Sequence, residues 1–408
     1  MKTKKNGNDP FYSNNTFCNS HISTRNLLTT KTMSEYTIRQ TEENDLESVM
    51  ALYNYSRSLM RKDGNSSQWV NGYPSAELVK EDIRRGISHV ITLDGEIAGV
   101  FVLIPGRDET YEVIEEGWWI DDTRPYSTIH RIARGPGRHG VFDACLEWSK
   151  RQATSIRIDT HADNRAMLHL LPKRGFDRRG IIHIADGTPR VAFQMLNTGA
   201  LCQPLEKHIE DSIIPRYDGF DSAHRIEHVR SVVDNSMKLA EIYHADKNMV
   251  YTVAAYHDTG LVAGREVHHI ESAKILLEDK TLPLWFSPEQ IRTMAEAVED
   301  HRASADNEPR SLYGKIVAEA DRDIEPQKII RRTVQYGLSN YPELDKESQW
   351  RRAKMHLNEK YGDHGYMKLW LPKSKNAEQL RELRRIINNE TLLREAFEKC
   401  FKALNGDE

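Results

Sequence analysis

The chain has 408 residues, more than one ordinary hydrophobic core accommodates, so we expect two domains. Its composition, 38% hydrophobic and 29% charged, is typical of globular proteins. The net charge of −4 argues against a nucleic-acid-binding protein or a polybasic membrane anchor, and no apolar stretch is long enough to span a membrane. The cysteines are far apart and lack CxxC spacing, which indicates reduced thiols in a cytoplasmic protein: Cys18, Cys145, Cys202 and Cys400.

Residues 1–33 are rich in Asn, Thr, Ser and Lys and contain no apolar segment typical of a secretory signal. Their composition predicts a disordered tail. Met33 precedes a strand-like pattern, so we regard it as a second candidate for the natural start of the chain.

Strands and helices alternate from residue 36 to about residue 197. The apolar periodicity predicts a helix over 45–58, and Asp94-Gly95 predicts a type I′ turn in a hairpin over 90–104. A strand over 127–133 is followed by a glycine-rich turn, Arg134-Gly135-Pro136-Gly137-Arg138-His139-Gly140, and then by a helix. The backbone N–H groups and the dipole at such a helix start favour an anion, and glycine lets a phosphate approach closely. An ordinary loop is the alternative, because many such turns bind nothing.

The order of these elements resembles the GCN5-related N-acetyltransferase (GNAT) family over nearly all of this half. The family turn R/Q-x-x-G-x-G/A cradles the pyrophosphate of acetyl-CoA; Arg134 and Gly137 match it, while the last small residue is displaced to Gly140. A second shared block is 158–164, followed by 173–176. The resemblance implies an α+β domain over 34–198, with a mixed, mostly antiparallel sheet flanked by helices. It also implies that acetyl-CoA is bound by Ile132, Ala133, Arg134, Gly135, Gly137, Arg138, His139, Gly140 and Asn164.

One position departs from the family pattern. Leu171 stands where many members carry a tyrosine that protonates the leaving thiolate, and a leucine has no proton to give. Glu115 and Glu116 precede Trp118-Trp119 near the expected acceptor cleft, so either could deprotonate an amine, although both are also compatible with a solvated surface. Leu171 therefore leaves two alternatives open: an N-acetyltransferase acting on an amine that the sequence does not identify, or a non-catalytic CoA-binding sensor or scaffold.

The stretch 199–214 lacks clean periodicity, which predicts a linker. The pattern from 215 to 408 predicts an almost wholly helical part that ends in a helix over about 377–403. In this part, five helices place histidines or aspartates on their apolar stripes; for example, His257 follows Val250, Val253 and Ala254 at helical spacing. Burying so many ionisable groups without partners is costly. A divalent metal removes that cost, because neutral imidazoles and carboxylates are its ligands. The candidate ligands are His228, His257, Asp258, His268, His301 and Asp321.

The order His228, His257-Asp258, Asp321 resembles the HD-domain superfamily of metal-dependent phosphohydrolases, over roughly 215–330. His268 and His301 resemble its binuclear branch, which includes bacterial hydrolases of diadenosine tetraphosphate. The resemblance implies an all-α domain and two ions (Mn, Fe, Zn or Co), bridged by the catalytic Asp258. The substrate would be a phosphorylated small molecule, a phosphate mono- or diester such as a nucleotide. A di-iron oxygenase is the alternative, since some HD proteins use two irons with dioxygen.

Several neighbouring residues are candidates for supporting roles. His224 could support His228 or touch the substrate, and His269 is better explained as a neighbour than as a ligand. Four cationic side chains near the ligands in sequence are candidates for binding phosphate oxygens: Arg265, Arg302, Arg310 and Lys315. The sequence thus predicts a bifunctional protein that joins an acetyl-CoA-dependent N-acetyltransferase to a metal-dependent hydrolase.

Overall fold

The computed structural model describes residues 36–220, 226–302 and 307–405. The expected tail over 1–33, the candidate start Met33, Cys18 and His224 lie outside these ranges. Within them, no helix combines the length and the apolar character needed to cross a membrane.

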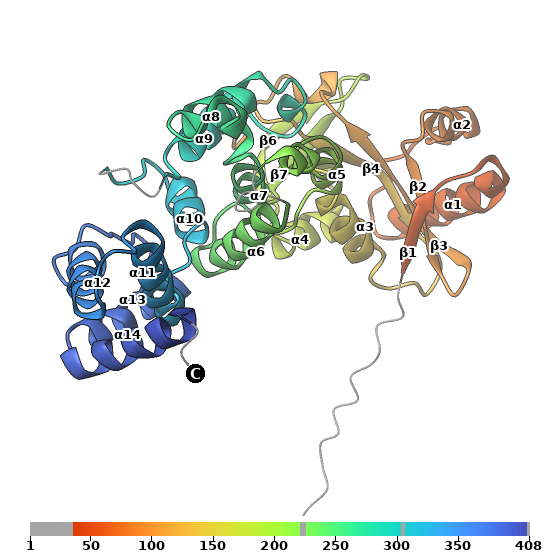
Figure 1. Cartoon of the computed structure of the whole chain (residues 1–408). Coiled ribbons are helices and arrows are strands. Elements are labelled where there is room, and N and C mark those ends of the chain that lie inside the picture. The colour runs from red at the N-terminus through yellow and green to blue at the C-terminus, as the bar shows by residue number, and fades with distance from the viewer. Residues whose placement is uncertain (1–35, 221–225, 303–306, 406–408) are drawn as a thin grey trace, which may run out of the picture. The chain divides into compact units, whose positions relative to one another are not determined.

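The N-terminal part is built on one seven-stranded sheet with the order β1-β2-β3-β4-β5-β7-β6 (Figure 1). Only β4 and β5 pair in parallel; every other neighbouring pair is antiparallel, which confirms the expected mixed sheet. Asp94 and Gly95 both have positive φ, as a type I′ turn between β2 and β3 requires. The strands are β1 (Thr37–Gln40), β2 (Ser88–Leu93), β3 (Glu96–Pro105), β4 (Ser127–Arg134), β5 (Ser155–Thr160), β6 (Asp177–His183) and β7 (Pro189–Leu196).

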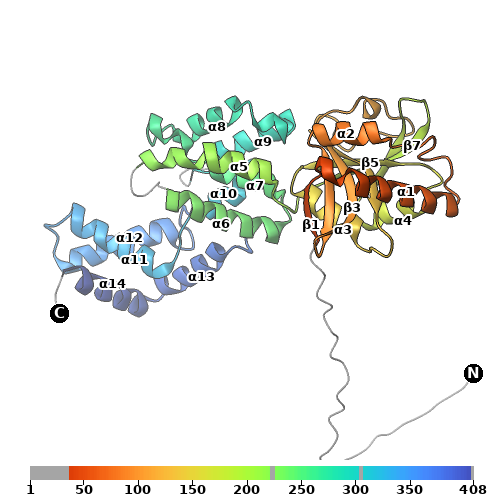
Figure 2. The same cartoon turned by 90° about the vertical axis from the view of Figure 1, so that its right-hand side faces the viewer.

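Helices cover both faces of this sheet, because alternate strand residues enter two different cores. Val90 and Val100 pack with α1 (Leu46–Lys62) and α2 (Ala76–Arg84), which lie over one face (Figure 2). Their neighbours Ile91 and Phe101 enter a second core with α3 (Val141–Lys150) and α4 (Arg165–Lys173). Both faces of β2 and β3 are therefore apolar, and the sheet is buried between two helical layers.

The strands β4 and β5 pair over only three residues of each, ending at Ile129 and Ile158. Beyond that point, β4 carries a bulge: Val100 opposes Ala133 whereas Val102 opposes His130, so β4 has one extra residue. Arg131 takes up the extra length with a φ of 49°, and two hydrogen bonds of 3.0 and 2.8 Å to Asp82 hold its side chain. The separation of β4 from β5 leaves one edge of each strand unpaired.

The next part is helical and has its own apolar core, which confirms the expected all-α region. The central helix, α7, is buried at every residue from Asn248 to Tyr256. Helix α5 lies within 199–214, the stretch expected to be a linker, and its Leu205 and Ile209 belong to this core. The elements are α5 (Gln203–Ser212), η3 (Ile214–Gly219), α6 (Ile226–Tyr243), α7 (Lys247–Tyr256), η4 (Thr259–Ala263), α8 (His268–Glu278), α9 (Pro288–Glu299) and α10 (Leu312–Ala320).

The last four helices form a further core around Leu357, Leu383, Leu393 and Phe397. They are α11 (Pro326–Asn340), α12 (Lys346–Tyr361), α13 (Lys375–Ile387) and α14 (Glu390–Asn405). The single helix expected over 377–403 is wrong, because the chain breaks at Asn388 and Asn389. Asn389 Oδ1 accepts a hydrogen bond from the Leu392 N–H at 3.1 Å, and this bond starts a new helix.

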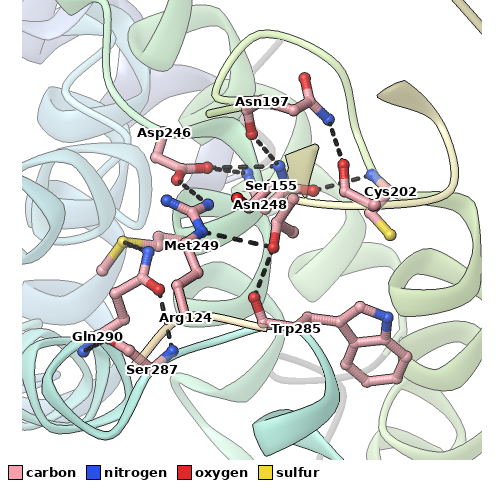
Figure 3. Close-up of polar contacts among 12 residues, drawn as sticks. Arg124, Ser155, Asn197, Cys202, Asp246, Asn248, Met249, Trp285, Ser287 and Gln290 are labelled. Carbon is pink, nitrogen blue, oxygen red and sulfur yellow. Dashed lines mark hydrogen bonds and ion pairs between the residues drawn. The ribbon is translucent and has the colours of Figure 1, made fainter. Parts of the chain in front are cut away.

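Polar contacts connect the sheet-bearing part to the helical core (Figure 3). Arg124 and Asp246 form a buried ion pair at 3.0 Å. The Thr154 hydroxyl donates to the Trp285 carbonyl at 2.6 Å. The Asn248 side chain accepts from the Cys202 N–H at 2.8 Å and donates to the Asn197 carbonyl at 3.2 Å. These buried bonds require both parts to keep one geometry at the contact.

Candidate metal centre and acyl-transfer cavity

Six side chains converge where several helices begin or end. His257 is the C-cap of α7, and Asp258 follows it directly. His268 is the first residue of α8, His301 follows α9, and Asp321 is the C-cap of α10. His228, in the first turn of α6, is the sixth. The structure thus brings together all six residues that the sequence predicts as metal ligands.

One side of this cluster is formed by His228, His257 and Asp321 around a carboxylate oxygen of Asp258. Asp258 Oδ2 lies 3.4 Å from His257 Nε2 and 3.8 Å from His228 Nε2. Asp321 Oδ1 lies 3.1 Å from His228 Nε2 and 4.0 Å from His257 Nε2. Two imidazole nitrogens and two carboxylate oxygens therefore face one small space.

The other oxygen of Asp258 faces a second pair of histidines. Asp258 Oδ1 lies 3.3 Å from His268 Nε2 and 3.3 Å from His301 Nε2, and these two nitrogens lie 3.2 Å apart. Asp258 is therefore shared by two ligand groups, each of which could hold one ion. A carboxylate with each oxygen directed at a different group is the arrangement that bridges two metals.

Backbone carbonyls fix the orientation of three of these rings. The Nδ1 atoms of His257, His268 and His301 lie 2.7, 2.8 and 2.5 Å from carbonyl oxygens of Ala254, Arg265 and Val298. Only a protonated Nδ1 can donate to a carbonyl, so Nε2 of each neutral ring presents a lone pair. Two lone pairs cannot hydrogen-bond one another, yet the Nε2 atoms of His268 and His301 are 3.2 Å apart. A cation between them resolves the conflict, so the residues present fit a metal.

The electrostatics of the cluster favour a cation. Burial works to raise the pKa of Asp258, but His257 and His301 hold it well below its usual range. Burial likewise disfavours a charged His257, yet Asp258 and Asp321 outweigh it and raise the pKa of His257 to about 9. The carboxylates therefore draw positive charge into the site, which a divalent ion would supply.

Gly260 allows the ligand-bearing segments to approach closely. A Cβ at this position would lie 2.4 Å from the carbonyl oxygen of His268 and 2.5 Å from the backbone nitrogen of Ser272. The Gly260 N–H donates to Ser272 Oγ at 2.8 Å, which locks the turn after Asp258 onto the start of α8. Both features position His268 against Asp258.

A cavity of about 450 Å³ lies beside the ligand-bearing segments and is lined by His269, Glu299, Asp300, Arg302, Asn307, Glu308 and Arg310. Two of the cations expected to bind phosphate already have carboxylate partners here. Arg310 pairs with Asp300 at 2.8 Å, and Lys315 pairs with Glu308 at 2.5 Å. Arg302 donates to the Glu266 carbonyl at 3.0 Å, so its side chain bridges the segments that precede and follow the site.

A larger cavity, of about 1190 Å³, opens where β4 and β5 part. Four of the residues predicted to bind acetyl-CoA line it: Ile132, Ala133, Arg134 and Asn164. Asn164 also caps α4, since its Oδ1 accepts from the Met167 N–H at 3.2 Å. Thr160 lines the same cavity, and its buried hydroxyl has no hydrogen-bond partner in the described part of the chain.

The glycine-rich turn leads from β4 into α3 at one side of this cavity. It contains the other predicted residues, Gly135, Gly137, Arg138, His139 and Gly140, and the first residues of α3, Val141 and Phe142, line the cavity. Gly140 is the N-cap with a φ of 80°, and no side chain caps the helix. The first N–H groups of α3 thus lack a capping side chain, so the residues present fit the pyrophosphate of CoA.

Glu115 and Glu116 do not line the cavity. The Glu115 backbone pairs with Ile181, and its exposed side chain lies 4.0 Å from His183 Nδ1. Leu171 belongs to α4, and its side chain is completely buried in the core that this helix covers. The lining instead includes His130, Asp108 and Asp159, which the sequence analysis did not single out. The only sequence signal for His130 is its place on the strand that leads into the glycine-rich turn.

Known proteins resemble both parts. The family model described as HD domain matches residues 225–323. Over 110 residues, 27% of this chain, the chain is 29% identical to the uncharacterized N-acetyltransferase YvbK of Bacillus subtilis (strain 168), and the match spans 65% of that relative. A GNAT-family acetyltransferase from Streptococcus agalactiae 2603 is 32% identical, covering 40% of this chain and 95% of that chain, with a TM-score of 0.37.

A further solved structure, AAC(6')-Ib in complex with ribostamycin and coenzyme A, is 20% identical. It covers 40% of this chain and 93% of that chain, with a TM-score of 0.30. The matches to acetyltransferases and the HD match fall on different parts of the chain. The N-terminal part of this chain is similar to GNAT acetyltransferases, and the chain carries an HD domain over residues 225–323.

Proposed function

We propose that the HD domain is a divalent-metal-dependent phosphohydrolase acting on a phosphate mono- or diester of a small molecule, such as a nucleotide. The observation that carries this proposal is the position of Asp258, whose two oxygens face two different groups of ligands. His228, His257 and Asp321 would hold one ion with Asp258, and His268 and His301 would hold the other.

The protein's own residues would keep the ligands in place before the substrate arrives. Carbonyl groups hold the rings of His257, His268 and His301 with Nε2 inward, and Gly260 keeps His268 against Asp258. When bound, two divalent ions supply Lewis acidity toward phosphoryl oxygens and an activated water near neutral pH. Asp258 would set the spacing of the two positions, because each of its oxygens is directed at one of them.

Phosphate release tests this proposal. The full chain would be assayed with nucleotides, dinucleoside polyphosphates and sugar phosphates in the presence of Mn²⁺, Fe²⁺ or Co²⁺, beside Asp258→Asn and the control His364→Gln. His364 is exposed and far from the site in sequence. We expect turnover by the wild type and the control, and a loss of at least ~100-fold in Asp258→Asn, because outer-shell changes alone cost up to that much. Turnover that requires dioxygen would support the di-iron oxygenase instead.

We propose that the GNAT domain is an acetyl-CoA-dependent N-acetyltransferase. Its support is the cavity at the parting of β4 and β5, into which the start of α3 opens and which Ile132, Ala133 and Asn164 line. Ile132 and Ala133 lie on β4 beyond the last pair with β5, so one edge of their backbone is free to bond the pantetheine arm. Asn164 would contact the same arm from the start of α4.

Release of the CoA thiol in the presence of a panel of primary amines tests this second activity, together with calorimetric titration of acetyl-CoA. We expect acetyl-CoA binding and acetylation of at least one amine. Binding without turnover would favour the sensor or scaffold, which the buried Leu171 in place of a tyrosine keeps open.

A further inference from the structure

A hydrogen-bonded cluster in the larger cavity has no part in the proposals above. His130 Nε2 lies 3.1 Å from Asp108 Oδ2, and His130 Nδ1 lies 4.0 Å from Asp159 Oδ1. Tyr111 donates its hydroxyl hydrogen to the same oxygen of Asp159 at 2.6 Å. His130, Asp108 and Asp159 all line the cavity. An imidazole thus lies between two carboxylates on the wall of the larger cavity.

The bond to Asp108 assigns the roles of the two ring nitrogens. His130 donates to Asp108 through Nε2, and this bond is the largest cause that holds the pKa of Asp108 well below its usual range. Asp108 also accepts from the Thr110 N–H at 3.0 Å and from its hydroxyl at 2.6 Å, so the carboxylate is fixed and ionised. With Nε2 occupied by the donated hydrogen, Nδ1 carries the lone pair of the neutral ring.

Asp159 and its partners complete the surroundings of Nδ1. At 4.0 Å, Asp159 is too far from Nδ1 for a direct hydrogen bond, but it is near enough to attract a cationic group placed between them. Arg190, from β7, lies 3.8 Å from the other oxygen of Asp159, and the Tyr111 ring meets the His130 ring edge to face at 5.9 Å. The side chain of Arg131, the next residue of β4, forms an ion pair with Asp82 and not with Asp159.

The cluster lies at the point where the strands separate. His130 directly follows Ile129, the last β4 residue paired with β5, and Asp159 directly follows Ile158 on the opposite strand. Two residues farther along β4 is Ile132, assigned above to the pantetheine arm. The bulge of β4 begins at His130, and bulges often turn a side chain toward an active site. His130 is therefore beside the segment that would hold the acyl donor.

We propose that His130 is the general base of the acetyl transfer, that Asp108 positions it, and that Asp159 attracts the cationic amine acceptor. This assignment rests on the proposed N-acetyltransferase activity. Nδ1 takes a proton from the ammonium group, and the freed nitrogen lone pair attacks the thioester carbonyl carbon. The C–N bond forms, and the C–S bond breaks with its electron pair on sulfur. The nitrogen loses two protons in total: one ends on sulfur, and the other leaves through His130 to solvent.

The test uses the full chain, acetyl-CoA and the amine turned over fastest among lysine methyl ester, tyramine, spermidine and kanamycin. His130→Gln cannot take a proton but can still donate to Asp108, and His169→Gln, an exposed position outside the cavity lining, is the matched control. We expect kcat/KM at neutral pH to fall ~10²–10⁴-fold in His130→Gln, the range typical of a lost general base. The acetyl-CoA Kd from calorimetry should stay within about twofold, because the arm and pyrophosphate contacts remain.

The pH profile separates a base from a structural residue. In His130→Gln, kcat/KM should keep rising with pH as solvent deprotonates the amine, whereas the wild type should level off. In Asp108→Asn, kcat/KM should fall less, by about tenfold. This variant replaces His130→Gln as the test if His130→Gln does not fold. Turnover in His130→Gln within about threefold of the wild type, with the wild-type pH profile, would overturn this assignment alone. A wild type that acetylates none of the four amines would overturn the assignment together with the proposed acetyltransferase.

Discussion

Arg124 and Asp246 form an ion pair at 3.0 Å in which both side chains are about 95% buried, and they belong to the sheet-bearing part and the helical core respectively. Asp246 also caps α7, because its other oxygen accepts from the Asn248 N–H at 3.0 Å. The helix that carries His257 and Asp258 at its end therefore begins at the contact with the other domain.

Removing Arg124 should destabilise the whole chain. Arg124→Met leaves the Asp246 carboxylate buried without its partner, so we expect the free energy of unfolding to fall by ~3–5 kcal/mol in urea titrations. The control is Arg84→Met, which removes an exposed pair with Glu81 and should leave the free energy of unfolding almost unchanged, because solvent screens an exposed ion pair. Equal losses of unfolding free energy in the two variants would show that the contact between the parts contributes little to stability.

The thiol of Cys202 should report on the same contact. Its side chain is fully buried, and burial raises the pKa of Cys202 to about 11. Because the thiolate is the reactive form, alkylation by iodoacetamide at pH 8 should be at least ~100-fold slower in the folded chain than in urea. Peptide mass spectrometry measures this, and we expect faster labelling in Arg124→Met. Rapid labelling of the native wild type would contradict the buried contact.

Gly260 should be intolerant of a side chain for reasons of space. Gly260→Ala places a Cβ 2.4 Å from the carbonyl oxygen of His268, so α8 must shift and the free energy of unfolding should fall by ~1–3 kcal/mol. The shift should also weaken the metal position formed by His268 and His301. Gly199→Ala is the matched control, because a Cβ there has no atom within 4 Å. A Gly260→Ala variant that matches this control in urea unfolding and in metal content would show that the space beside Gly260 is not limiting.

The clustering of the six candidate metal ligands could be predicted from the sequence because each lies on the apolar stripe of a helix or directly after one. His257 and His301 follow apolar residues at helical spacing, and the helices place them as that spacing requires. The hairpin turn at Asp94-Gly95 could be read for a similarly local reason, since both residues adopt positive φ readily.

Other features depend on contacts between distant segments. Helix α5 begins with Pro204 near its first position, which is favourable at a helix start although it resembles a linker residue in the sequence. His130 lies on a strand whose bulge and separation from β5 set its surroundings, and no local pattern encodes either. Arg124 and Asp246 are 122 positions apart in the sequence, so only the folded chain pairs them.

The number of metal ions per chain tests the two-metal site most directly, measured by mass spectrometry of the protein after equilibration with Mn²⁺ and removal of free metal. The position of Asp258 between two candidate ligand groups predicts two ions in the wild type and in His364→Gln. It predicts one ion in His268→Gln, which loses a ligand from one group only, and a loss of both in Asp258→Asn. A wild type that retains no metal, or an Asp258→Asn variant that retains two ions, would show that Asp258 does not hold two metals together.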